Sequence, residues 1–125
     1  MELMNVEIYT ANQALTELAK RELPVKVSYG LAKIKIAISK PFQAIEEIRT
    51  GLVRKYGKED KETGTVNITP GMPDFGKFQE DYSVLMQETA DVTFEKVTLP
   101  LEVDGKALQV TTEILLALTP FVDVE

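Results

Sequence analysis

The feature that most constrains the fold is a long apolar pattern in residues 25–56. Positions in this segment recur at alternating spacings of three and four, which is typical of one face of a helix. These positions are Leu31, Ile34, Ile38, Pro41, Ile45, Ile48, Leu52 and Lys55. We call the six aliphatic members of this set the seam. A helix through the segment would hold up to about 30 residues and be about 45 Å long.

A second regularity lies one position before the seam. Small residues recur there every seven positions, at Gly30, Ala37, Ala44 and Gly51. A glycine in a helix interior costs about 1 kcal/mol relative to alanine. Two such glycines therefore indicate that packing needs the space, and this small-residue stripe predicts the close approach of another helix.

A β-hairpin competes with the helix over residues 25–40. Apolar and polar residues alternate from Lys33 to Lys40, and they also alternate at Val25, Val27 and Tyr29. This alternation is typical of strands, and Gly30 would provide the turn. Pro41 opposes an uninterrupted helix, since it lacks the backbone N–H and crowds the preceding turn. The residues alone leave helix and hairpin open here.

The remaining elements are short and of mixed type. We expect a strand over residues 2–9, then a helix capped by Thr10 that ends near Glu22. After a loop, Asp74 caps a helix that extends to residue 89. Residues 92–103 are predicted to be extended, with a bulge or break at Glu95-Lys96 where the alternation changes phase. Asp104-Gly105 predicts a hairpin turn, and a short helix follows over residues 111–118.

These elements predict one α+β domain over residues 1–125. If residues 25–56 form the long helix, the centre of this domain is an antiparallel helical hairpin made by that helix and the helix at 74–89. A short N-terminal helix and a small antiparallel sheet, built from the N-terminal strand and the C-terminal hairpin, complete the expected fold.

Composition excludes most catalytic chemistry. The 125 residues include no histidine, cysteine or tryptophan, which removes Ser-His-Asp and Cys-His catalysis, thiolate metal sites and disulfides. No phosphate-binding glycine motif occurs. Glu46 and Glu47 would point about 100° apart on a helix, so they do not converge as an acid–base pair. We therefore expect no enzyme and no catalytic, cofactor or metal site.

Charge is distributed unevenly along the chain. Residues 20–58 hold ten basic and three acidic residues, a balance of +7, while the rest of the chain carries −13 and the whole chain −6. Opposed blocks of this kind most often satisfy each other, within one chain or between copies. On a helix, Lys26, Lys33, Lys40 and Arg54 would form one basic ridge. An anionic ligand is the alternative reading of this ridge, and nucleic acid is a weaker one.

Several segments resemble small uncharacterised proteins encoded by tailed bacteriophages and prophages, and the likeness follows most of the chain in order. The segments are Leu23-Pro24-Val25-Lys26, Ser28-Tyr29, Leu31-Ala32-Lys33-Ile34, Glu46-Glu47-Ile48-Arg49, Leu52-Val53-Arg54-Lys55-Tyr56-Gly57, Glu59-Asp60 and Leu118-Thr119-Pro120-Phe121. The resemblance implies a phage origin and a long helix over residues 25–56. With it we favour the helix over the hairpin, kinked near Pro41.

The expected function is contact between proteins. We expect a non-enzymatic phage or prophage protein that self-associates and contacts other phage proteins, as a minor virion component or an assembly factor. The alternative is a regulatory or anti-defence protein that captures a host protein or an anionic small molecule. The expected location is the host cytoplasm or the virion, without a membrane. The expected oligomer interface consists of Gly30, Leu31, Ile34, Ala37, Ile38, Ala44 and Ile45.

Overall fold

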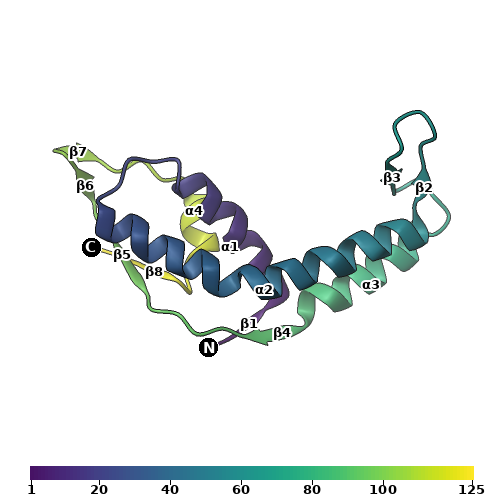
Figure 1. Cartoon of the computed structure of the whole chain (residues 1–125), viewed down its shortest axis with the longest axis horizontal. Coiled ribbons are helices and arrows are strands. Elements are labelled where there is room, and N and C mark those ends of the chain that lie inside the picture. The colour runs from purple at the N-terminus through teal and green to yellow at the C-terminus, as the bar shows by residue number, and fades with distance from the viewer.

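One helix, α2 (Val25–Tyr56), runs the length of the protein in the computed structural model, which describes residues 1–125 (Figure 1). The helix has 32 residues and would be about 48 Å long at the usual rise. It continues through Pro41, so the β-hairpin alternative for residues 25–40 is wrong. The kink near Pro41 stays a prediction.

The burial of three isoleucines explains why the helix is formed despite the strand-like alternation. Ile34 and Ile38 are completely buried, whereas Ile36 between them is 72% exposed. A strand would place all three on one face, but a helix separates Ile36 from the other two. The spacing of three and four therefore decides which residues enter the core.

Four helices and eight short strands make up the fold, which confirms the mixed helix and strand class. In chain order they are β1 (Glu2–Met4), α1 (Asn5–Leu18), α2, β2 (Lys58–Glu59), β3 (Val66–Asn67), α3 (Phe75–Gln87), β4 (Thr89–Asp91), β5 (Val97–Leu99), β6 (Glu102–Val103), β7 (Lys106–Ala107), α4 (Thr112–Ala117) and β8 (Val122–Val124).

The strands form four separate pairs. The pairs β1–β4, β2–β3 and β6–β7 are antiparallel, and β5–β8 is parallel. The expected single sheet of the N-terminal strand and the C-terminal hairpin is therefore wrong. The N-terminal strand pairs instead with the segment that follows α3, in the register Leu3 to Ala90.

The chain enters its first helix earlier than the sequence predicted. The expected strand over residues 2–9 ends at Met4, and α1 begins at Asn5. The Glu7 carboxylate accepts a hydrogen bond from the Met4 N–H at 3.0 Å, which satisfies a donor at this helix start. Thr10 lies inside the helix, where its hydroxyl donates to the Val6 carbonyl at 2.9 Å.

Turn and break signals later in the chain are confirmed. Residues 93–96, between β4 and β5, belong to no strand, so the phase change at Glu95-Lys96 is a break. Asp104 and Gly105 have φ values of 53° and 77°, as a tight hairpin turn between β6 and β7 requires. The Thr111 hydroxyl accepts from the Ile114 N–H at 3.3 Å and caps α4.

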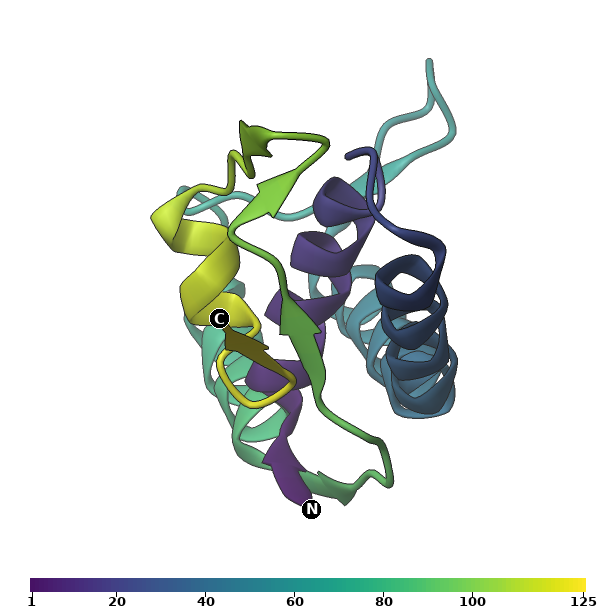
Figure 2. The same ribbon diagram turned by 90° about the vertical axis from the view of Figure 1, so that its left-hand side faces the viewer.

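The core lies at one end of the molecule. All 18 buried residues are apolar, and none falls between Ile45 and Met86. We call the buried part the body; it comprises α1, α4, β5, β8 and the N-terminal half of α2 (Figures 1 and 2). Residues 46–56 of α2 project from it with α3 alongside and the β2–β3 pair at the far end. We call this projection the arm.

Ile34→Ala tests the buried face of α2. Since Ile34 is completely buried, the substitution should lower the free energy of unfolding by about 2–5 kcal/mol. The matched control Ile36→Ala removes an exposed side chain from the same helix and should change it by less than about 0.5 kcal/mol. Urea unfolding followed by circular dichroism measures both values. Equal losses in the two variants would contradict the helical phase.

Candidate functional site

The expected oligomer interface is mostly interior. Leu31, Ile34, Ile38 and Ile45 are at most 4% exposed in a single chain. They pack into one core with α1 and β5, so no second copy can reach them without unfolding the body. The expectation that these four seam residues face another copy is therefore wrong.

The small-residue stripe divides into a covered and an open part. A Cβ built on Gly30 would lie 2.6 Å from a Val97 methyl group, so the glycine makes room for β5 of the same chain and not for a second helix. Ala37 is half-buried. Ala44 is exposed, and a Cβ on Gly51 would meet nothing within 4 Å. The open part of the stripe thus lies toward the arm.

Half-buried contacts hold the arm together. The Tyr56 hydroxyl donates to the Asp81 carboxylate at 2.7 Å and joins the end of α2 to α3. The Phe78 and Tyr82 rings stack with centroids 5.7 Å apart. Ile48 remains 53% exposed on α2. Met86, near the end of α3, is the one buried residue of the arm.

At the junction of the arm and the body, Glu46, the first of the two adjacent glutamates, forms an ion pair with Arg49. Arg49 donates to both oxygens of Glu46, each at 3.1 Å. This hydrogen bonding is the main cause that raises the pKa of Arg49, and burial is the main cause that raises the pKa of Tyr82. Both shifts move the groups further from neutral pH, so Arg49 stays charged and Tyr82 stays protonated. The arrangement fits a structural clamp and not acid–base work.

The loop that follows β2 contains the acidic residues Asp60 and Glu62, and these contact each other locally. The Asp60 carboxylate accepts from the Glu62 N–H at 2.9 Å, which is a local turn contact. No group of three or more acidic residues is placed so that it could hold a metal ion.

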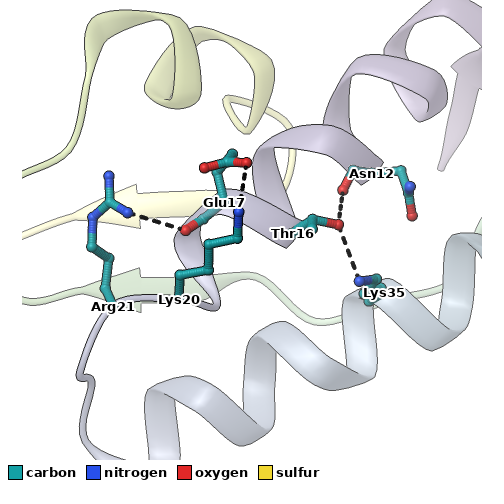
Figure 3. Close-up of polar contacts among 6 residues, drawn as sticks. All are labelled: Asn12, Thr16, Glu17, Lys20, Arg21 and Lys35. Atoms are coloured by element: carbon teal, nitrogen blue, oxygen red, sulfur yellow. Dashed lines mark hydrogen bonds and ion pairs between the residues drawn. The ribbon is translucent and has the colours of Figure 1, made fainter.

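The basic block of residues 20–58 is mostly unpaired. Figure 3 shows how three of its members are held: Lys35 donates to the Thr16 hydroxyl at 3.1 Å, Lys20 pairs with Glu17 at 3.1 Å, and Arg21 donates to the Glu17 carbonyl at 3.2 Å. Arg49 pairs with Glu46 as described. The side chains of the other six form no hydrogen bond or ion pair: Lys26, Lys33, Lys40, Arg54, Lys55 and Lys58. The charge blocks therefore do not neutralise each other within one chain.

A groove at the body brings together part of the basic ridge. It has a volume of about 950 Å³, and Lys26, Tyr29 and Lys33 line it from α2. Lys96 and Thr98 line the opposite wall. Lys40 does not line this groove, and Arg54 lies on the arm. Of the four ridge residues, the structure therefore brings only Lys26 and Lys33 into one cavity.

The second wall of this groove was not identified from the sequence. Two sequence features mark the ends of the strand that forms this wall: the phase change at Glu95-Lys96 before it and Pro100 after it. Neither signal indicates which helix lies opposite, because that depends on contacts between distant parts of the chain.

Comparison with protein-family models gives no match, and comparisons with curated proteins and with solved structures give none either. None of the helices combines the length and the apolar character needed to cross a membrane.

Gly30→Ala tests whether the close contact with Val97 requires a glycine. Alanine should gain about 0.5–1 kcal/mol of helix propensity at either glycine of α2. At Gly30 crowding of the buried Val97 should cost about 1–3 kcal/mol, while at Gly51 there is open space. We expect Gly51→Ala to stabilise the protein and Gly30→Ala to be about 1–3 kcal/mol less stable than Gly51→Ala. An equal gain at both positions in urea unfolding would show that β5 does not need the glycine.

Proposed function

We propose that this chain is a non-enzymatic protein that works by self-association and contact with other proteins, and that the arm is its assembly element. The observation that carries the proposal is the absence of any buried residue between Ile45 and Met86. Two helices that leave this much apolar surface half-covered gain stability when another surface covers them.

The proposed contact face lies on the arm side of α2. Ala44, Ile48 and Gly51 follow one another at spacings of four and three, so they share one face of the helix. Ile48 is the exposed apolar residue of this face, with a small residue on each side. Small flanking residues let a second helix approach closely, so Ile48 could be buried between two copies.

The two helices of the arm support a symmetric contact. We propose that they act as an antiparallel helical hairpin whose partner is the hairpin of a second copy. The end of α2 carries unpaired Arg54 and Lys55; α3 carries exposed Glu80, and exposed Glu88 follows its last residue. A two-fold arrangement would place α2 of each copy against α3 of the other. The basic end of each α2 would then face the acidic residues on or after the α3 of its partner, so this attraction would occur twice.

The resemblance of the sequence to small phage proteins supports a setting for this assembly. We propose a phage or prophage protein of the host cytoplasm or the virion, acting as a minor virion component or an assembly factor. The second candidate is a regulatory or anti-defence protein that captures a host protein or an anionic molecule, and it is favoured by the unpaired Lys26 and Lys33 in the groove. Purification from infected cells separates these settings, since co-sedimentation with particles supports the first and a soluble host partner supports the second.

Ile48→Glu tests the assembly face. We expect the wild-type protein to show a mass above that of a monomer in light scattering at micromolar concentration. The charge of Ile48→Glu would be buried in the contact, so the dissociation constant should rise at least about tenfold. The matched control Ile36→Glu changes a more exposed residue on the body half of the same helix and should leave the constant within about twofold.

A monomeric wild-type protein at every concentration would overturn this proposal. Equal loss of association in Ile36→Glu and Ile48→Glu would move the contact away from the arm. Unchanged circular dichroism of each variant is the control for folding.

A further inference from the structure

A stretch of backbone beside the groove has no partner within the protein. Residues 93–96 form no backbone–backbone hydrogen bond, and β5, which follows them, pairs with β8 on one side only. The Val97 N–H donates to the Phe121 carbonyl at 3.1 Å, and the Leu99 carbonyl accepts from the Glu125 N–H at 3.2 Å. Residues of a strand alternate between its two edges, so the N–H and C=O of Thr98 point away from β8.

The open edge of β5 lies next to α2. Figure 2 shows β5 between β8 and the N-terminal half of α2, and the Gly30–Val97 contact joins helix and strand. The groove runs along this junction, with Thr98 and Lys96 on the strand wall and Lys26 and Lys33 on the helix wall. Between the two lysines, the Val97 side chain of β5 fills the space that Gly30 leaves on the helix wall.

The helix wall is basic without any compensating acid. Residues 25–45 contain four lysines and no aspartate or glutamate. Lys26 makes no polar contact, and the Lys33 ammonium lies 4.6 Å from the centroid of the Tyr29 ring, a contact that leaves its charge uncompensated. The strand wall is mixed, since Glu95 and Glu125 also line the groove and Lys96 pairs with Asp123 at 3.6 Å. The positive charge of the groove therefore comes from the helix wall, at Lys26 and Lys33.

We propose that this groove binds an extended acidic segment of a partner protein, which adds as a strand to the open edge of β5. The main chain of the segment would pair with Thr98 and, two residues earlier, with Lys96. Its acidic side chains would pair with Lys26 and Lys33 of α2. Hydrogen bonds to the backbone give affinity for any extended chain, and the two lysines select an acidic one.

The edge also sets the length of the bound segment. Pro100 has no N–H and ends the open edge on one side. On the other side, the Val92 N–H donates to the Met1 carbonyl at 2.8 Å, next to the β1–β4 pair. The segment therefore pairs along residues 93–98 alone. This inference deepens the second candidate function and does not depend on the arm.

The test uses a short fluorescent peptide that alternates valine and glutamate, with the full-length protein as receptor. We expect saturable binding at physiological ionic strength. Amide hydrogen exchange at Lys96 and Thr98 should slow at least about tenfold in the complex, because these N–H groups gain partners. A peptide with the same side chains but N-methylated backbone positions should bind at least about tenfold more weakly.

Charge-reversal variants provide the matched comparison. The double variant Lys26→Glu, Lys33→Glu should lose at least about tenfold in affinity. The double variant Lys61→Glu, Lys77→Glu changes the net charge equally on the arm and should stay within about twofold. Ile48→Glu should bind the peptide like the wild type, so that failure of the groove and failure of the arm are told apart.

Three results would overturn the inference. The first is no binding of the acidic peptide. The second is binding without slower exchange at Lys96 and Thr98, or equal binding of the N-methylated peptide, which would show a purely electrostatic contact. The third is an equal loss in the two charge-reversal variants, which would place the peptide outside the groove.

Discussion

The packing of the N-terminal half of α2 against α1 and β5 is the interaction on which the rest of the structure depends. Complete burial of a side chain such as Ile34 or Ile38 contributes about 1.5–3 kcal/mol, and the buried residues of α2 all lie between Leu31 and Ile45. The core is therefore confined to the body, and the second half of the same helix continues beyond it. The arm is a consequence of one helix that is longer than the core it supports.

The sequence carried enough information to find the buried face but not to find what covers it. Spacings of three and four placed Ile34 and Ile38 together, and the structure buries both while exposing Ile36. The stripe of small residues correctly indicated a close approach at Gly30, yet the approaching element is β5 and not a second helix. Periodicity reports which face of a helix is apolar, whereas the identity of its neighbour depends on contacts between distant segments.

Short patterns were the least reliable guide, because strand and helix periods coincide over a few residues. Val6 and Ile8 alternate like a strand, but Ile8 continues into α1 with Ala11 and Leu15 at helical spacing. The candidate site shows the same limit. Lys26 and Lys33 could be identified from their spacing on one helix, whereas the strand wall required the break after β4 to be placed in space.

An open strand edge is a hazard for a soluble protein, because it can pair with the same edge of another copy. Here the basic wall of α2 lies beside that edge, so two copies that met edge to edge would bring Lys26 and Lys33 of both close together. The like charges of the lysines oppose self-pairing at such a contact, whereas the side chains of an acidic strand can pair with these two lysines. In the proposed arrangement, the two lysines that select the ligand would also protect the edge, and self-association would be left to the arm at the other end of α2.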